Sequence, residues 1–300
     1  MIENPISSQN NPFKTAQELS RPLVLDGAMG SYLQQKGFIR DDKLWMTKLI
    51  TTNPEEIIKV HKEYIEAGAD IITTNTFRTN PSAFESSGSS YQYKYVKQAV
   101  DLAESSIADR EILIAGSNAP AEDCYQRERT LSYNKLEINH KKHIDLLINN
   151  DVYFILNETQ SHFDEIKIIC RHCSQSKIPF VMSLYLDNST RILSGESFNE
   201  IISFILEYAP LAIGINCISP EVFKNILAVE HFNFCWGFYL NCGSGLPTDR
   251  NIDCAVSPNE YREFIKKSLP LNPSFIGSCC GSNPSHIKII REFLDGKNSN

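Results

Sequence analysis

Short apolar runs alternate with longer amphipathic segments along nearly all of this 300-residue chain. The apolar runs are rich in Val, Ile, Leu and Phe without strict alternation, a pattern typical of strands covered on both faces. Eight such runs occur, at residues 22–26, 70–74, 111–116, 152–158, 179–186, 211–217, 232–240 and 274–278. Eight strands with helices between them predict an α/β fold, namely a single-domain (β/α)8 TIM-type barrel. A doubly wound open sheet is the alternative, because this pattern does not reveal the order of the strands.

Helices are expected between the apolar runs, and three of them have clear start signals. Asn-Pro-Glu-Glu at residues 53–56 combines an N-cap residue, a proline at the first helical position and early acidic residues. Ser-Pro-Asn-Glu at 257–260 and Asn-Pro-Ser-His at 283–286 are similar. Further helices are expected at residues 93–108, 135–149, 163–174, 198–208 and 221–229.

Two polar stretches, residues 78–92 and 121–134, are expected to form loops after the second and third strands. In a barrel both loops would lie on the carboxyl face, where active sites are built. No internal domain boundary is evident, so we assign residues 21–296 to the barrel, residues 1–20 to an N-terminal extension and residues 297–300 to a C-terminal tail.

The composition excludes some classes of partner. A net charge of −7 and an isoelectric point near 5.6, with no basic run, argue against binding to nucleic acid or to an anionic membrane. Residues 1–20 do not resemble a signal peptide, and no run of about 18 apolar residues suggests a membrane span. Nine cysteines without a secretory signal favour a cytoplasmic location with free or metal-bound thiols. No dimerisation arm follows Leu294, so we expect a monomer.

Three cysteines occupy the carboxyl ends of predicted strands. Cys217 ends the sixth apolar run, and Cys279 and Cys280 follow the eighth, just before Gly281. A barrel would gather them at one mouth, and three converging thiolates would suit a zinc ion with an open fourth position. The alternative for any one of them is a small buried apolar residue. Two adjacent thiols at a glycine-flanked strand end pack poorly as core, and a disulfide between neighbours would strain the peptide.

Polar residues stand at other strand ends. Asp26 and Glu158 end the first and fourth runs and Thr74 ends the second, so a barrel would place two carboxylates near the cysteines. Carboxylates in such a mouth suit the ammonium group of an amino acid. The seven histidines do not fall at strand ends, and we expect surface or capping roles for them. No Ser-His-Asp spacing, Walker loop or dinucleotide-binding fingerprint is present.

The other cysteines are expected to be structural. Cys170 and Cys173 have CxxC spacing, but they lie on a predicted amphipathic helix and are interpreted as core plus surface. No ligand spacing is seen for the remaining four, Cys124, Cys235, Cys242 and Cys254. Of these, Cys242 follows a strand end and could approach the mouth.

Four segments together resemble the homocysteine S-methyltransferase family. They are LDGAMG at residues 25–30, GADIITTNTF at 68–77, GINC at 214–217 and GSCCGSNPSHI at 277–287. The resemblance extends from residue 21 to residue 294, and the paired-cysteine motif together with the GINC motif is highly specific. It implies a (β/α)8 barrel that transfers a methyl group to homocysteine and forms methionine.

The family resemblance also implies roles for individual residues. One zinc ion is expected on Cys217, Cys279 and Cys280, with the homocysteine sulfur bound to the metal. Asp26 and Glu158 match the carboxylates that hold the substrate amino group.

Gly27, Thr74 and Phe77 match other positions that line the family's substrate pocket. Three thiolates leave a zinc site with a charge of about −1, which keeps a bound substrate thiolate nucleophilic. No catalytic residue beyond this thiolate is expected, since the reaction mainly requires positioning of the two substrates.

The methyl donor is less defined. Asp-Lys-Leu-Trp at residues 42–45 resembles the branch that uses S-methylmethionine, and Trp45 could offer a cation–π face to a positive donor. An ordinary core tryptophan is the alternative. The chain departs from that branch at residues 118–123, where the family has a glycine- and tyrosine-containing loop, and less strongly at Asn157 and Ser278.

We therefore expect a zinc-dependent thiol methyltransferase whose partners are small molecules. Its donor would be a sulfonium compound, S-methylmethionine first and S-adenosylmethionine second. The alternatives are another acceptor such as selenocysteine or a different small thiol, betaine as the donor, or a catalytically silent barrel that binds zinc or an amino acid.

Overall fold

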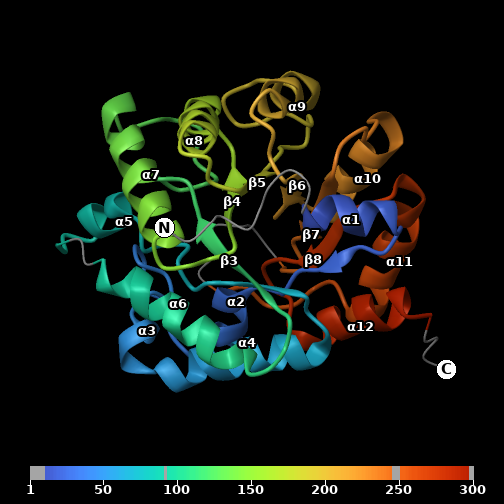
Figure 1. Ribbon diagram of the computed structural model, residues 1–300, viewed down its shortest axis with the longest axis horizontal. Coiled ribbons are helices and arrows are strands. Elements are labelled where there is room, and N and C mark those ends of the chain that lie inside the picture. Colours follow the sequence, from blue (N-terminus) through green and yellow to red (C-terminus); the bar gives the residue numbers. More distant parts are fainter. Residues whose placement is uncertain (1–10, 91–92, 245–250, 297–300) are drawn as a thin grey trace.

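The computed structural model describes residues 11–90, 93–244 and 251–296 and contains one sheet of eight parallel strands (Figure 1). Their bounds are β1 Leu23–Val24, β2 Ile71–Thr73, β3 Leu113–Asn118, β4 Phe154–Gln160, β5 Phe180–Leu184, β6 Ala212–Asn216, β7 Trp236–Leu240 and β8 Phe275–Ser278. Each of these strands overlaps one of the eight predicted apolar runs.

The strands close into a barrel. Their order is β1-β8-β7-β6-β5-β4-β3-β2, and Leu25 forms a parallel bridge with Ile71 that joins the two ends of this series. The backbone N–H of Asp26 donates to the Ile71 oxygen at 2.9 Å, and that of Asp70 donates to the Val24 oxygen at 2.7 Å. This closure confirms the predicted (β/α)8 barrel and excludes the doubly wound sheet.

Helices surround the barrel, and all those predicted from the sequence are present. They are α4 Pro54–Ala67, α6 Lys94–Ile107, α7 Tyr133–Ile148, α8 Phe163–Gln175, α9 Phe198–Leu206, α10 Pro220–Val229, α11 Pro258–Ser268 and α12 Pro284–Leu294. Ser257 and Glu260 form a capping box that begins α11, and Gly68 ends α4 in the left-handed conformation with φ of 110°. In the described ranges no helix combines the length and the apolar character that crossing a bilayer requires.

Five short helical elements lie outside the predicted set. They are α1 Pro12–Glu18, α2 Met29–Gln35, α3 Leu49–Thr52, α5 Pro81–Ser86 and the 3-10 helix η1 Leu269–Leu271. The prediction that residues 78–92 form a loop is wrong where α5 lies. The Asn80 side chain accepts the Ala83 backbone N–H, and Pro81 occupies the first helical position, so a local cap starts a helix within a polar stretch.

Helix α1 covers the amino-terminal end of the barrel. The Phe13 ring is 5.4 Å from the Phe154 ring and 5.4 Å from the Phe275 ring, both edge-on. The Asn11 Nδ2 donates to the Leu211 oxygen at 2.8 Å. Helix α1, which belongs to the predicted extension 1–20, therefore closes the amino-terminal end of the barrel. This end lies opposite to the carboxyl ends of the strands, which carry the site. Residues 1–10 and the predicted tail 297–300 lie outside the described residues.

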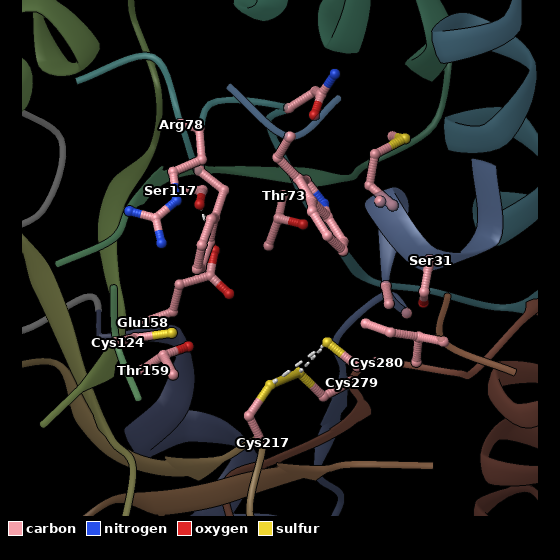
Figure 2. A pocket seen from close by; sticks show the side chains of 18 of the residues that line it. Ser31, Thr73, Arg78, Ser117, Cys124, Glu158, Thr159, Cys217, Cys279 and Cys280 are labelled. Carbon is pink, nitrogen blue, oxygen red and sulfur yellow. Dashed lines mark hydrogen bonds between the residues drawn. A yellow bond between two sulfur atoms is a disulfide. The ribbon is translucent and has the colours of Figure 1, made fainter. Parts of the chain in front are cut away.

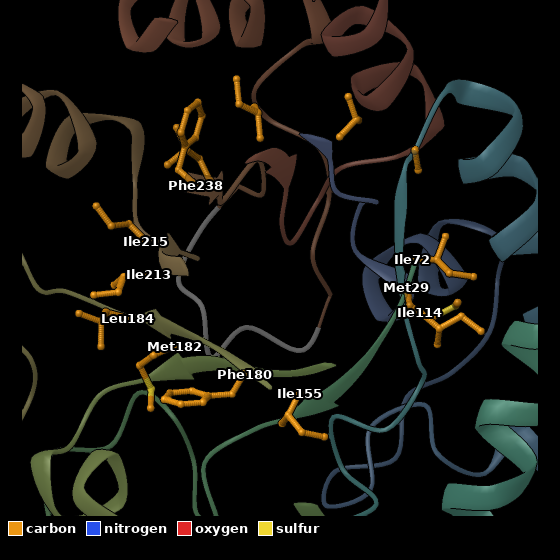
Figure 3. Packing of buried hydrophobic residues seen from close by; sticks show 14 of the residues in the cluster. Met29, Ile72, Ile114, Ile155, Phe180, Met182, Leu184, Ile213, Ile215 and Phe238 are labelled. Atoms are coloured by element: carbon orange, nitrogen blue, oxygen red, sulfur yellow. The ribbon is translucent and has the colours of Figure 1, made fainter. Parts of the chain in front are cut away.

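Apolar side chains pack in two shells. On β4, Phe154 and Leu156 belong to the cluster inside the barrel, whereas Ile155 belongs to the cluster between strands and helices. Figure 3 shows part of this outer cluster, with side chains directed away from the barrel axis. Because alternate residues serve the two shells, the strands are apolar throughout, as predicted. Cys217 and Cys279, which follow β6 and β8, also belong to the inner cluster, at the carboxyl end of the barrel.

The histidines differ most from expectation. Surface or capping roles were predicted for all seven, and the surface prediction is wrong for the six that are buried: His61, His140, His143, His162, His172 and His286. Five of them lie on helices and His162 directly precedes α8. Some have charged partners, as His140 does with Glu165 at 2.5 Å. His286 is buried and also completes the predicted cap of α12 with Asn283. Cys170 and Cys173 were interpreted as core plus surface; both are buried, so the core interpretation is confirmed and the surface interpretation is wrong.

Candidate active site at the barrel mouth

The three strand-end cysteines lie together in one pocket (Figure 2). Cys217 follows β6, and Cys279 and Cys280 follow β8. Cys217 and Cys279 are joined by a disulfide, and the Cys280 Sγ lies 3.9 Å from the Cys217 Sγ and 4.0 Å from the Cys279 Sγ. The three sulfurs all lie within 4.8 Å of one another, as ligands of one metal ion must. The barrel thus brings the predicted cysteines to one point.

The spacing of these sulfurs fits zinc once the disulfide is reduced. In a tetrahedral site with Zn–S bonds of about 2.3 Å, two ligand sulfurs lie about 3.8 Å apart. The Cys280 sulfur already has this separation from both of its neighbours. Three protein ligands also leave one coordination position free, which is typical of catalytic rather than structural zinc sites.

Backbone geometry holds the cysteines in place. Cys217 has a φ of 53°, and its N–H donates to the Tyr239 oxygen at 3.1 Å. Gly281 has a φ of 83°, and a Cβ at this position would lie 2.5 Å from the backbone of Gly243. A side chain at 281 would collide with this backbone, so the glycine after the cysteine pair is a steric requirement.

Two carboxylates face the same pocket. The Asp26 carboxylate accepts the Thr73 backbone N–H at 2.8 Å and the Thr73 hydroxyl at 3.1 Å, and the Ser117 hydroxyl donates to the Glu158 carboxylate. Burial raises the pKa of Asp26 well above its ordinary value, and the charge of Glu158 adds to this rise. Burial also raises the pKa of Glu158, to about 7.

The two carboxylates have no cationic partner among the described residues, although Arg40, Lys43 and Arg78 line other parts of the pocket. No cation contributes to the pKa of either Asp26 or Glu158. Burial raises the pKa of the Cys280 thiol to about 11, and the charge of Glu158 contributes again. A metal cation or an ammonium group would reverse the shifts, because opposite charges favour the ionised forms. This part of the pocket is therefore suited to cations.

A bulge at the end of β4 places Glu158 and Thr159 together in the pocket lining. The pairing of β4 with β5 changes register there, and Thr159 has a φ of 58°, a conformation that costs a β-branched residue about 1–3 kcal/mol. Asn216 holds it: its Oδ1 accepts the Thr159 N–H at 2.9 Å, and its Nδ2 donates to the Thr159 hydroxyl at 2.8 Å. These hydrogen bonds connect β4, which carries Glu158, to Asn216, the residue before Cys217.

Other residues matched by the family resemblance also line the pocket. Gly27 is closely surrounded, since a Cβ there would lie 2.7 Å from the Tyr64 ring. The Thr74 hydroxyl lies 2.7 Å from the Thr76 hydroxyl and accepts the Ser117 backbone N–H at 3.1 Å. Thr74 therefore joins β2 to β3 and supports the pocket wall.

Aromatic surface comes from Phe77, which follows β2, and from Trp45, which lies between α2 and α3. Trp45 is half-buried, has a φ of 52° and packs against Gly30, where a Cβ would lie 1.7 Å from the Trp45 Nε1. The Arg40 guanidinium lies 5.1 Å from the Trp45 ring. Trp45 therefore combines core packing with a place at the pocket, and its role toward a donor stays a prediction.

Several lining residues were not singled out from the sequence. They are Thr73, Arg78, Ser117, Cys124 and Tyr125. Cys124 was expected to be structural, yet it lines the pocket with Tyr125 from the loop after β3. The available signal was the predicted position of the 121–134 loop on the carboxyl face. Cys242 is not among the described lining residues, but its N–H donates to the Cys280 oxygen at 2.7 Å.

The mouth of this (β/α)8 barrel combines three clustered cysteine sulfurs with two carboxylates. Together they define a class of enzyme site that suits a thiolate-bound metal and a small cationic substrate. The chain matches the family model described as homocysteine S-methyltransferase over residues 23–294. It therefore belongs to the homocysteine S-methyltransferase family, and the protein is a methyltransferase.

Relatives of this family span almost the whole chain. Homocysteine S-methyltransferase 2 of Arabidopsis thaliana is 26% identical, with 92% of this chain and 94% of the relative covered. Homocysteine S-methyltransferase of Escherichia coli K12 is 24% identical, with 95% and 99% covered. Selenocysteine Se-methyltransferase of Brassica oleracea var. italica is 24% identical, with 92% and 90% covered.

Solved structures of the homocysteine methyltransferase MmuM from Escherichia coli share the fold. The metallated form has a TM-score of 0.78 at 22% identity and covers 94% of this chain and 99% of its own. The oxidized form has a TM-score of 0.80 at 22% identity, with 95% and 100% covered. These similarities support the barrel and its closure.

Proposed function

We propose that this protein is a zinc-dependent homocysteine S-methyltransferase that takes the methyl group of a sulfonium donor, foremost S-methylmethionine, and forms methionine. The observation that carries the proposal is one pocket that contains three clustered cysteine sulfurs and the carboxylates of Asp26 and Glu158. Thiolates suit zinc, and carboxylates suit the ammonium group of an amino acid. Family membership supports methyl transfer as the reaction.

Cys217, Cys279 and Cys280 would hold the zinc in the reduced protein. Zinc bound there would lower the pKa of a substrate thiol, so that the substrate is a thiolate at neutral pH. Because burial raises the pKa of the Cys280 thiol to about 11, this thiol is neutral before metal arrives. Zinc uptake is therefore expected to release protons.

Asp26 and Glu158 would bind the ammonium group of homocysteine. Their hydrogen bonds from Thr73 and Ser117 orient both carboxylates before the substrate enters. Such orientation in advance is what a positioning mechanism requires. An ammonium group between them would also lower both raised pKa values, so binding and ionisation of the carboxylates favour each other.

The reaction needs no general acid from the protein. The acceptor sulfur forms a bond to the methyl carbon while the bond from that carbon to the donor sulfonium breaks, and the electron pair returns to the donor sulfur. With S-methylmethionine as donor, the methylated acceptor and the demethylated donor are both methionine, and each is a neutral thioether. No histidine is among the described residues that line the pocket, which agrees with chemistry based on positioning.

The size of the cavity bears on the donor. Its volume of about 220 Å³ is below the roughly 300–1,000 Å³ typical of sites for drug-sized ligands. A small sulfonium amino acid needs less of this space than S-adenosylmethionine, which carries a nucleoside. Selenocysteine is a second candidate acceptor, favoured by the relative named selenocysteine Se-methyltransferase. Comparison of homocysteine and selenocysteine at equal donor concentration separates the two acceptors.

The metal part of the proposal is tested by zinc content in matched serine variants. Cys280→Ser removes one proposed ligand, whereas Cys254→Ser removes an exposed cysteine outside the pocket lining. After reduction and zinc loading, we expect about one zinc per chain in the wild type and in Cys254→Ser, and both zinc and activity lost in Cys280→Ser. Full activity of Cys280→Ser would overturn the proposal.

We also propose that the enzyme acts as a monomer, which sedimentation equilibrium tests.

A further inference from the structure

Arg78 is a pocket cation that the proposed function does not use. It follows Phe77 in the segment between β2 and α5, is half-buried, and lines the same pocket as the cysteines (Figure 2). Its guanidinium contacts the backbone oxygens of Glu122 at 2.9 Å and Pro120 at 3.4 Å, and it lies 5.1 Å from the Phe77 ring. None of these contacts carries a charge, so in the described ranges the guanidinium has no carboxylate partner.

These contacts also restrict how the guanidinium can move. Both hydrogen bonds come from the Arg78 Nη1, which leaves the Nε and Nη2 donors for another acceptor. A planar guanidinium that is already held by two carbonyls and an aromatic ring loses little freedom when it binds a carboxylate. The Nε and Nη2 donors of Arg78 are therefore available to an anionic ligand that enters the pocket.

The pocket has electrically opposite sides. Figure 2 shows Arg78 on one side and the cluster of Cys217, Cys279 and Cys280 on the other, with Glu158 between them in this view. The acidic side suits the positive sulfur of a donor and the ammonium group of the acceptor. The side with Arg78 suits a negative group, and placing a sulfonium there would bring two positive charges together.

We propose that Arg78 binds the carboxylate of the methyl donor and so makes the enzyme select sulfonium donors that carry a carboxylate. The assignment rests on the proposed function, because the donor role comes from it. S-Methylmethionine has its positive sulfur at one end of a short chain and its α-carboxylate, beside the α-ammonium, at the other. With its carboxylate on Arg78, its sulfonium methyl is directed toward the cysteine side, where the acceptor sulfur is proposed to lie.

The chain offers a matched control. Arg40 also lines the pocket and also stacks on an aromatic ring, that of Trp45 at 5.1 Å. Arg40 also lines a second cavity, which includes Asn251, so this residue lies between the active-site pocket and the second cavity. Arg40→Met therefore removes a positive charge of the same kind from the same pocket without removing the proposed carboxylate receptor.

The test is isothermal titration calorimetry of the zinc-loaded full chain with two probes, S-methylmethionine and trimethylsulfonium, which has the sulfonium but no carboxylate. Loss of a charge-assisted hydrogen-bonded pair in Arg78→Met is expected to weaken S-methylmethionine roughly ten- to a hundredfold. Binding of trimethylsulfonium by Arg78→Met should stay within about twofold. Arg40→Met also alters the surroundings of the Trp45 ring, so it should change the affinities for both probes by a similar factor. Arg78→Lys, which keeps the charge but loses the planar fork, should give an intermediate loss.

Three results would overturn the assignment. Equal losses for both probes in Arg78→Met and Arg78→Lys would mean that the residue only supports the loop after β3. An unchanged affinity for S-methylmethionine in Arg78→Met would mean that the carboxylate binds elsewhere. A selective loss of S-methylmethionine confined to Arg40→Met would move the receptor to Arg40.

Calorimetry also separates this assignment from the proposed function. If the wild type binds S-methylmethionine through Arg78 but transfers no methyl group from any donor, the proposed function fails and the receptor stands. If the wild type forms methionine while Arg78→Met keeps full affinity for the donor, the function stands and the receptor fails. A wild type that binds neither probe overturns the receptor.

Discussion

Replacing Glu158 by glutamine tests whether this carboxylate is held for function at the expense of stability. Burial raises its pKa from 4.5 to about 7, so the unfolded chain releases this proton at a lower pH than the folded protein does. The contribution of Glu158 to stability is therefore fully present below pH 4.5 and is lost as the pH rises through about 7. The difference between the two pKa values corresponds to about 3 kcal/mol.

Glutamine cannot ionise, so Glu158→Gln should escape this loss. The free energy of unfolding of the variant minus that of the wild type should rise by about 3 kcal/mol between pH 4.5 and pH 8. Urea unfolding of both proteins at the two pH values measures it. Both samples are metal-free, because a bound cation would favour the carboxylate. A difference that does not change with pH would refute the reasoning.

The Glu158→Gln variant should also bind homocysteine more weakly. Removing a charged partner of the substrate ammonium is expected to weaken binding by at least about tenfold. A protein that becomes more stable at pH 8 and binds its substrate less well has lost a functional carboxylate rather than a structural one. Unchanged homocysteine affinity would contradict the role proposed for Glu158.

Three further outcomes are expected. Gly30→Ala places a Cβ where the Trp45 Nε1 now lies, so the ring must move; the KM for the donor should rise while zinc content stays constant, and an unchanged KM would argue against a donor role for Trp45. Burial lowers the pKa of His61 to about 4, so the wild type loses up to about 3 kcal/mol of stability as the pH falls from 6.5 to 4. His61→Leu cannot be protonated and should not show this loss, as urea unfolding at the two pH values would measure. Zinc uptake should require prior reduction of the Cys217–Cys279 disulfide, and equal zinc content with and without reductant would contradict this.

The barrel was predictable because each strand is apolar on both faces and each helix carries local start and stop signals. Helix α5 was missed although Asn80 and Pro81 gave it a local start signal, whereas other missed features depend on partners far away in the sequence. Helix α1 closes the amino-terminal end of the barrel only because Phe13 meets the Phe154 and Phe275 rings. The burial of His140 depends on Glu165 in another helix. Neither contact leaves a periodic pattern in the sequence.

The same distinction applies to the site. Cys217, Cys279, Asp26 and Glu158 end strands, and barrel topology alone brings strand ends together. The loop after β3 is different, because long-range hydrogen bonds place it over the pocket. The Glu165 carboxylate accepts the Ala121 N–H at 2.7 Å, and the Arg78 guanidinium donates a hydrogen bond to the Glu122 backbone oxygen at 2.9 Å. Sequence spacing contains no signal for such contacts.

Methionine formation from homocysteine and S-methylmethionine, by zinc-loaded protein beside a chelator-stripped sample, tests the central claim most directly. We expect turnover by the zinc-loaded protein, loss of turnover after stripping, and recovery when zinc is returned to the reduced protein. Equal turnover by the stripped protein would contradict a role for zinc. If the zinc-loaded protein forms no methionine with S-methylmethionine, S-adenosylmethionine or betaine, the proposed methyl transfer to homocysteine is wrong.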